Sequence, residues 1–228
     1  MSKRLIIAID GPAGAGKSTL ARRVAERLGA TYIDTGAMYR AIALWALRQG
    51  IPTDDSHRLE ALAQHAQIEF PGPSKITLNG EDVSGAIRTS EVATAASQIA
   101  AIPGVRRALV AIQRDIAETA SIVMEGRDIG SIVFPDADVK IFLDASTDIR
   151  ARRRADELEA KQEPVDFDHL RSQIEERDSR DRTRSASPLI QAMDATYLDS
   201  SALSPAEAEE EILRIIRSKT SNGKVLVP

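Results

Sequence analysis

The sequence predicts an α/β fold of three layers, in which a five-stranded parallel sheet lies between helices. Short β-branched segments alternate along the chain with longer segments in which apolar residues recur every three or four positions. This alternation is typical of parallel sheets with right-handed crossovers and helices on both faces. Acidic residues stand at the C-terminal ends of several of the apolar segments. Because ligands of such sheets bind beyond the carboxyl ends of the strands, we expect a binding site at that edge.

Five segments have the length and composition of short strands, and the first of them suits a strand buried on both faces. They are residues 4–9, 30–34, 121–125, 138–144 and 195–199. The acids that fall at the ends of the first four are Asp10, Asp34, Glu125 and Asp144. Such an acid can instead cap the helix that follows, and for Asp144 we favour that role.

Helical periodicity fills the intervals between these strands. Leu20, Val24 and Leu28 lie at i, i+4 and i+8 after Lys17, and Gly29 predicts the end of this helix. Further helices are predicted over 37–49, 90–101, 104–119, 148–161 and 168–184. The stretch Ser204-Pro205-Ala206-Glu207 predicts the start of a last helix, because it combines a capping box with proline at the first helical position.

Two segments interrupt the alternation. Residues 51–88 carry turn signals at Pro71-Gly72-Pro73 and Asn79-Gly80 between strand-like runs, which predicts a small β insertion beside a helix at 57–66. Residues 155–168 are highly charged, and we interpret them as a mobile cover. The tail, residues 221–228, is expected to fray.

Composition narrows the class of protein. The 228 residues can form a full core with one or two small subdomains, and the net charge of −4 argues against bulk nucleic-acid binding. Arginines nevertheless gather at 150–154 and 177–184, which suits the binding of a small anion. The chain has no cysteine and no apolar stretch of about 18 residues. We expect a cytoplasmic monomer without nucleic-acid or membrane partners.

The clearest motif runs from Gly11 to Thr19. Gly11-x4-Gly16-Lys17-Ser18 matches the phosphate-binding pattern G-x-x-x-x-G-K-[ST] in full, with Gly14 as an additional glycine. Backbone N–H groups of such a loop and of the helix after it point at phosphate oxygens. Lys17 reaches the β- and γ-phosphates, and the Ser18 hydroxyl ligates Mg²⁺. The fold is therefore predicted to be a P-loop NTPase fold, and we expect Lys17 to be an exposed loop residue.

P-loop proteins include switches, motors and kinases. The sequence lacks the Asn-Lys-x-Asp run that reads guanine, and Arg127 separates the acids Glu125 and Asp128 where motors usually carry paired acids. A small chain with two insertions favours phosphoryl transfer to a small molecule. A kinase for another small acceptor and a non-catalytic ATP-binding regulator are the alternatives.

Acceptor recognition is expected to come from polar residues after the strands. Thr35, Tyr39 and Arg40 stand at the start of a helix, although Tyr39 could equally be a core residue and Arg40 a surface residue. Arg127 and Asp128 follow a central strand, where a buried charge needs a partner or a ligand.

Two helices concentrate charge in a way that suggests a site. Leu170, Ile174, Arg177, Asp181 and Arg184 are spaced by four, three, four and three, so one face passes from apolar to charged. The alternative is a set of solvated salt bridges, which we assign to the pairs Glu176–Arg180 and Asp178–Arg182. In the preceding helix, arginines crowd the N-terminal half against the helix dipole, which suits a lid that brings positive charge onto a phosphoryl group. These arginines are Arg150, Arg152, Arg153 and Arg154.

These stretches together resemble the bacterial cytidylate kinases, a branch of the nucleoside monophosphate kinases. The most particular ones are EGRDIGSIVFPDADVKIFLDAS and ERDSRDRTRSASPL, and the resemblance spans nearly the whole chain. It implies a single kinase domain that transfers the γ-phosphate of ATP to CMP or dCMP with Mg²⁺. The implied parts are a core (about 1–34, 89–150 and 178–228), a part that binds the monophosphate (about 35–88) and a lid (about 151–177).

The resemblance also implies roles for individual residues. Arg40, Arg127 and Arg184 are expected at the acceptor phosphate, and Thr35, where the family often has serine, and Tyr39 complete this region. At the cytosine ring we expect Ser97, Arg106 and Asp128, and at the sugar Asp181. Asp128 could alternatively be only the partner of Arg127. Lys17, Arg127, Arg177 and Arg184 form the expected catalytic set, and Arg152 and Arg154 are expected to contact ATP together with Gly11, Pro12, Ala13, Gly14, Ala15, Gly16, Lys17, Ser18 and Thr19.

Overall fold

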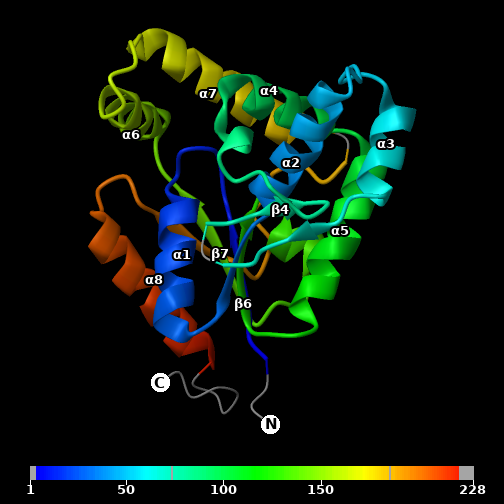
Figure 1. Cartoon of the computed structure of the whole chain (residues 1–228). Coiled ribbons are helices and arrows are strands. Elements are labelled where there is room, and N and C mark those ends of the chain that lie inside the picture. Colours follow the sequence, from blue (N-terminus) through cyan, green and yellow to red (C-terminus); the bar gives the residue numbers. More distant parts are fainter. Residues whose placement is uncertain (1–3, 73, 185, 221–228) are drawn as a thin grey trace. The chain divides into compact units, whose positions relative to one another are not determined.

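The computed structural model describes residues 4–72, 74–184 and 186–220 (Figure 1). Internal contacts divide the chain into two compact units. Unit 1 comprises the residues up to Thr31 together with those from Ser121 onward, and unit 2 comprises Tyr32–Ala120. The division expected from the sequence differs in giving 89–120 to the core. That three-part division is a functional one, and it stays a prediction.

The main sheet has five parallel strands, as predicted, and their order is β2-β6-β1-β7-β8. The strands are β1 (Ile6–Asp10), β2 (Thr31–Asp34), β6 (Ile122–Gly126), β7 (Val139–Asp144) and β8 (Thr196–Asp199). In the register of the sheet, Asp10 at the end of β1 is level with Gly126 of β6 and Phe142 of β7. The loop after β1 and the loop after β6 therefore leave the same edge of the sheet as neighbours.

Among the described residues, four α-helices belong to unit 1. They are α1 (Lys17–Leu28), α6 (Thr147–Glu159), α7 (Phe167–Thr183) and α8 (Pro205–Thr220). α1 ends at Gly29, whose φ of 60° is left-handed, and α8 begins with the predicted capping box. In that box the Glu207 N–H donates to Ser204 Oγ at 3.3 Å, and the Ser204 N–H donates back to Glu207 Oε2 at 2.8 Å. α1 and α8 pack against each other, and α6 packs against α7 (Figure 1).

The prediction that Asp144 caps the following helix is wrong. α6 begins at Thr147, so the capping position belongs to Ser146, whose Oγ accepts from the Ile149 N–H at 3.4 Å. Asp144 lies two residues too early, and its carboxylate accepts from the adjacent Ala145 N–H at 2.8 Å.

Unit 2 contains the β insertion that the sequence predicts. Its elements are α2 (Thr35–Arg48), α3 (Ser56–Gln64), β3 (Ile68–Glu69), β4 (Thr77–Leu78), β5 (Glu81–Asp82), the 3₁₀ helix η1 (Ala86–Arg88), α4 (Ser90–Ile99) and α5 (Pro103–Ala117). β3, β4 and β5 form an antiparallel sheet. Asn79 and Gly80 connect β4 to β5 with φ of 52° and 82°, as a tight hairpin turn requires. Met38, Ile42, Leu59, Ile87 and Ile99 are fully buried in the core of this unit.

Two predictions involve residues outside the described ones, namely the turn at Pro71-Gly72-Pro73, because of Pro73, and the fraying of residues 221–228. None of the helices described between residues 4 and 220 is both long and apolar enough to cross a membrane.

Candidate active site

The glycine loop connects β1 to α1, and sterics require its first glycine. A Cβ on Gly11 would lie 1.9 Å from the carbonyl oxygen of Leu143, so only glycine fits beside β7. Gly14 and Gly16 have φ of 77° and 92°, a region that glycine enters at no steric cost. In the described part of the chain no side chain caps the N-terminus of α1. This helix end therefore offers its N–H groups to an anion.

Three cationic side chains hold the carbonyl oxygens of the loop. Lys17 Nζ donates to the Pro12 oxygen at 2.7 Å, Arg150 Nη1 to the Ala13 oxygen at 3.1 Å, and Arg153 Nη1 to the Ala15 oxygen at 3.2 Å. Carbonyl groups fixed in this way fit a loop whose N–H groups face an anion.

Lys17 is not the exposed loop residue that the sequence predicts. Lys17 is buried, at 5% exposure, and its Nζ donates to the Pro12 oxygen of the loop that precedes it. Burial lowers the pKa of the Lys17 ammonium to about 7, and the positive charge of Arg127 acts in the same direction. The guanidinium of Arg127 is therefore close enough to Lys17 for the two positive charges to repel each other.

The hydroxyl side chains of the motif suit a role beside a metal ion. Ser18 and Thr19 are exposed at the start of α1. Among the described residues no group of three or more His, Cys, Asp or Glu side chains could hold a metal by itself. A hydroxyl at this position, such as Ser18 Oγ, could serve as a ligand of a Mg²⁺ ion that is bound to nucleotide phosphates.

Asp10 connects the end of β1 to the loop after β6. Its carboxylate accepts from the N–H groups of Ile129 and Gly130 at 2.8 and 2.7 Å, at the start of the π-helix η2 (Ile129–Val133). Burial raises the pKa of the Asp10 carboxyl to about 6, although these two N–H groups act to lower it. The sequence predicts no role for Asp10 beyond its place at a strand end. That place, directly before the glycine loop, was the available signal.

Four predicted residues come together in unit 1 as a buried cluster, consisting of Arg127, Asp128, Asp181 and Arg184. Arg127 Nε donates to Asp181 Oδ2 at 2.8 Å. Arg184 Nη1 lies 3.7 Å from Asp181 Oδ1, and Arg184 Nη2 lies 3.8 Å from Asp128 Oδ1. Burial raises the pKa of the Asp181 carboxyl, but Arg127 and the other arginines outweigh it, so this pKa lies below its ordinary value. Two arginines thus share two carboxylates with little water around them.

α7 presents the predicted face inward for most of its length. Leu170, Ile174 and Arg177 are half-buried and Asp181 is buried. The charge of Arg177 lowers the pKa of both Lys17 and Asp181. The helix ends at Thr183, so Arg184 continues the face as the capping residue, with extended backbone.

The predicted surface pair Asp178–Arg182 is wrong. Asp178 is buried, and its Oδ2 lies 2.7 Å from Arg150 Nη2. The reason is that α7 packs against α6, which buries a second strip of α7 beside the predicted face. The pair Glu176–Arg180 stays a prediction.

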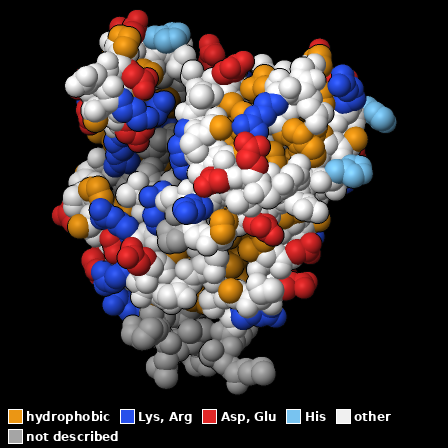
Figure 2. Space-filling view, in the orientation of Figure 1, with side chains coloured by type: hydrophobic (Ala, Val, Ile, Leu, Met, Phe, Trp, Pro, Cys, Tyr) orange, Lys and Arg blue, Asp and Glu red, His pale blue; other side chains and the backbone are white. Residues whose placement is uncertain are grey.

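The structure separates the four arginines of α6 into two groups. Arg150 and Arg153 contact the glycine loop, as described above. Arg152 lies over the Phe167 ring at 4.9 Å, and Arg154 pairs with Glu157 at 2.9 Å. Arg152 and Arg154 are exposed. Basic (blue) and acidic (red) side chains lie side by side on the surface of α6, at the upper left of Figure 2. The structure therefore brings neither Arg152 nor Arg154 to the loop.

In unit 2, the start of α2 holds two predicted residues in defined positions. The Asp34 carboxylate caps α2 by accepting from the Ala37 N–H at 2.9 Å, and it also accepts from Arg40 Nη2 at 2.8 Å. Arg40 is therefore a paired, partly buried residue, not a free surface residue. Thr35 is buried at the first position of the helix.

The other predicted residues of unit 2 lie on α2, α4 and α5. The Arg106 guanidinium lies over the Tyr39 ring at 5.5 Å, and its Nη1 donates to the Ala100 oxygen at 3.1 Å. Tyr39 is half-buried, so it is not a simple core residue. Within the described residues, Ser97 Oγ is buried without a hydrogen-bond partner. A buried hydroxyl of this kind suits a ligand that supplies the missing bond.

A family model described as cytidylate kinase matches residues 7–218 of this chain. The chain belongs to the cytidylate kinase family. It is 62% identical to a cytidylate kinase from Solibacter usitatus, over 97% of this chain and 96% of that protein. A cytidylate kinase from Klebsiella pneumoniae is 48% identical over 94% and 96% of the two chains. A bifunctional pantoate ligase/cytidylate kinase from a Synechococcus strain is 50% identical, but the alignment covers only 41% of that protein.

Solved structures support the same fold. A gluconokinase from Sinorhizobium meliloti superposes with a TM-score of 0.51 at 15% identity, covering 97% of each chain. An uncharacterized protein from Eubacterium ventriosum gives a TM-score of 0.52 at 14% identity, covering 94% of this chain and 99% of that one. At these identities the likeness concerns the fold alone.

Proposed function

We propose that this chain transfers the γ-phosphate of ATP to the phosphate of CMP or dCMP, forming ADP and CDP or dCDP. In this reaction a phosphate oxygen of the acceptor forms a bond to the γ-phosphorus while the bond from that phosphorus to the β,γ-bridging oxygen breaks. The observation that carries the proposal is the buried cluster. Arg127 follows β6 at the same edge of the sheet as the glycine loop, and Arg184 lies 3.8 Å from Asp128 Oδ1 in that cluster. Membership of the cytidylate kinase family supports it.

The donor is assigned to the glycine loop. The N–H groups from Gly11 to Thr19 bind the ATP phosphates, and Lys17 contacts the β- and γ-phosphates. Mg²⁺ bound to ATP and to Ser18 Oγ would offset charge on the β- and γ-phosphates. Arg152 and Arg154 contact ATP through exposed side chains that the α6 helix presents.

The acceptor phosphate is assigned to Arg40, Arg127 and Arg184. Each of these arginines pairs with a carboxylate, which holds its guanidinium in place before substrate binds. Arg177 adds positive charge near Lys17. Phosphoryl transfer needs mainly positioning and neutralisation of charge, so we assign no residue as a catalytic base.

Recognition of the nucleoside is assigned to Ser97, Arg106 and Asp128 for cytosine and to Asp181 for the sugar. Cytosine carries an amino donor where uracil carries a carbonyl, so a carboxylate favours cytosine. The unpaired Ser97 Oγ supports the same assignment, because it is free to bond to the base. Thr35 and Tyr39 complete the region around the acceptor.

A coupled assay of ADP production tests this function. We expect multiple turnovers with CMP or dCMP and far slower turnover with UMP or AMP. Equal rates with UMP or AMP would favour a kinase for another acceptor. ATP binding with no CMP-dependent ADP production would favour a non-catalytic regulator, which family membership does not support.

We also propose that the protein acts in the cytoplasm, where ATP and CMP, which do not cross membranes unaided, are available. It is expected to be a monomer, and light scattering after size-exclusion chromatography would give its mass in solution.

A further inference from the structure

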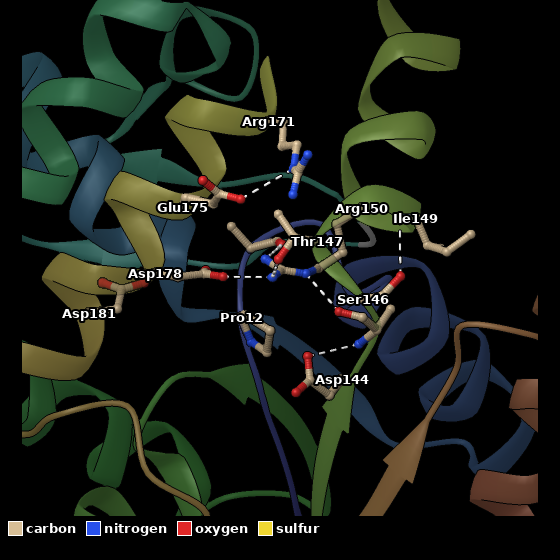
Figure 3. Close-up of polar contacts among 12 residues, drawn as sticks. Pro12, Asp144, Ser146, Thr147, Ile149, Arg150, Arg171, Glu175, Asp178 and Asp181 are labelled. Carbon is tan, nitrogen blue, oxygen red and sulfur yellow. Dashed lines mark hydrogen bonds and ion pairs between the residues drawn. The ribbon is translucent and has the colours of Figure 1, made fainter. Parts of the chain in front are cut away.

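Arg150 occupies a central position among the polar contacts behind the glycine loop (Figure 3). Nη1 donates to the Ala13 oxygen in the loop at 3.1 Å, and Nε donates to the Ala145 oxygen at 2.9 Å. Nη2 donates to Thr147 Oγ1 at 3.0 Å and lies 2.7 Å from Asp178 Oδ2. One guanidinium therefore contacts the loop, the N-terminal end of α6 and α7 at once.

The loop and α6 are in direct contact at this residue. A Cβ on Gly14 would lie 3.1 Å from Arg150 Cβ, so the missing side chain of Gly14 lets the loop approach the helix. The Arg150 side chain is only 3% exposed. It is therefore placed to fix the loop from behind and is not available to reach phosphates as a mobile lid arginine.

Asp178 supplies the counter-charge for this buried arginine. Its side chain is 8% exposed, and its Oδ2 pairs with Arg150. Asp178 Oδ1 is buried with no hydrogen-bond partner among the residues that the structure describes. A buried carboxylate with one unpaired oxygen is costly unless its partner stays in place, so Asp178 and Arg150 depend on each other.

We propose that Arg150 is a positioning residue for the donor nucleotide, acting through the Ala13 carbonyl, with Asp178 holding its guanidinium in the required orientation. The inference rests on the proposed assignment of ATP to the glycine loop. It differs from the sequence-based lid interpretation, in which the arginines of this helix touch the phosphates themselves. Arg150 instead sets the conformation of the backbone that binds them.

Lysine cannot replace this arrangement. The guanidinium makes bonds in several directions from a planar fork, whereas an ammonium is a point charge with a different reach. Arg150→Lys keeps the charge opposite Asp178 but loses the simultaneous bonds to Ala13 and Ala145. This variant separates charge compensation from support of the loop.

The test compares three variants with the unmodified protein. Arg150→Lys removes loop support, and the double variant R150M/D178L removes both members of the pair, a change that often leaves stability unchanged or higher. Arg171→Met is the matched control. Arg171 also connects α7 to α6, since its Nε lies 3.1 Å from Asp148 Oδ1, but its side chain is 49% exposed. Its ion-pair partners in the described part of the chain are Asp148 and Glu175, neither of which belongs to the loop. Calorimetry with a non-hydrolysable ATP analogue gives Kd, and steady-state assays give KM for ATP and for CMP.

We expect Arg150→Lys and R150M/D178L to weaken binding of the analogue and raise the KM for ATP by about tenfold or more. The KM for CMP should change by less than about twofold, and Arg171→Met should match the unmodified protein in all three quantities. If R150M/D178L is as stable as the unmodified protein and also binds the analogue as tightly, the Arg150–Asp178 pair does not position the loop for the donor nucleotide and the inference is wrong. Equal rises in both KM values would also overturn it.

The binding measurement separates this inference from the proposed function. If the unmodified protein produces no ADP with CMP, the proposed function fails, but Kd for the analogue still tests the role of Arg150. Lys17→Ala serves as the binding control, because loss of affinity in that variant confirms that the analogue occupies the loop.

Discussion

The buried cluster and the outer face of α6 both combine arginines with acids, but their surroundings differ. In the buried cluster the side chains of Asp128 and Arg184 are each 6% exposed, whereas on α6 those of Arg154 and Glu157 are 46% and 64% exposed. An exposed ion pair contributes about 0–1 kcal/mol, while a buried charge that loses its partner costs about 3–5 kcal/mol. Charge kept in the interior therefore points to a function much more strongly than charge on a solvated helix.

The largest effect is expected for Lys17, whose ammonium lies near the buried cluster. Lys17→Ala should lower kcat by about 100-fold or more, because it removes the cation that contacts the transferring phosphate. The melting temperature should hardly change or should rise, since a buried ammonium with a lowered pKa does not stabilise the fold. Steady-state kinetics and thermal unfolding measure both quantities, and a melting temperature lower by many degrees would mean that Lys17 is structural.

Within the buried cluster, Arg184→Ala should reduce kcat/KM for CMP by about 100-fold. This substitution removes an arginine that is assigned to the acceptor phosphate. It also removes the positive charge that lies 3.8 Å from Asp128 Oδ1. Binding of an ATP analogue should change much less. The two quantities are compared in the same preparation, with Arg184→Lys as the variant that keeps the charge, and equal losses for ATP and CMP would assign Arg184 to the donor.

The pKa of Lys17 adds a test by pH. Because the pKa is lowered to about 7, the free enzyme at pH 8 carries mostly neutral Lys17, and phosphate binding favours the protonated form. ATP binding should therefore take up a proton and weaken by up to about tenfold per pH unit above 7. Calorimetry in buffers of different ionisation enthalpy measures this uptake, which Lys17→Ala should abolish.

The same lowered pKa fixes the sign of a stability effect. Between pH 7 and pH 10.5, the ordinary value, the unfolded chain binds a proton that the native chain does not, so the Lys17 contribution to stability rises with pH in this range.

The smallest effect is expected on the outer face of α6. Arg152→Ala and Arg154→Ala should each raise the KM for ATP by about two- to fivefold, because exposed and mobile side chains contribute little individually. The KM for CMP should not change. A 100-fold rise in the KM for ATP in either variant would mean that these arginines contribute as much as those of the buried cluster. The contrast between the two regions would then be wrong.

Much of the molecule could be predicted from local patterns. The glycine motif, the five strands, the Asn79-Gly80 turn and the capping box at Ser204 can each be recognised from residues close in sequence. The gathering of Arg127, Asp128, Asp181 and Arg184 was also predicted, from the spacing along α7 and from the resemblance. Whether they contact CMP stays a proposal.

What could not be predicted depends on neighbours far along the chain. The burial of Lys17 follows from the path of the loop, and the pairing of Arg150 with Asp178 follows from the packing of α6 on α7. The helical spacing identified one charged face of α7, but it could not show that the buried part of the helix is wide enough to include Asp178. The π-helix after β6 likewise depends on Asp10, more than 100 residues earlier.

The first glycine of the loop has a consequence for experiments on sequence variation. The space that a side chain at Gly11 would need is filled by the backbone of β7, whereas Ser18 is exposed. In a scan of all substitutions, replacements at Gly11 should remove folded protein from the cell, while replacements at Ser18 should leave its abundance intact and remove only growth that depends on the enzyme. Two positions of one motif would thus report separately on protein abundance and on catalysis.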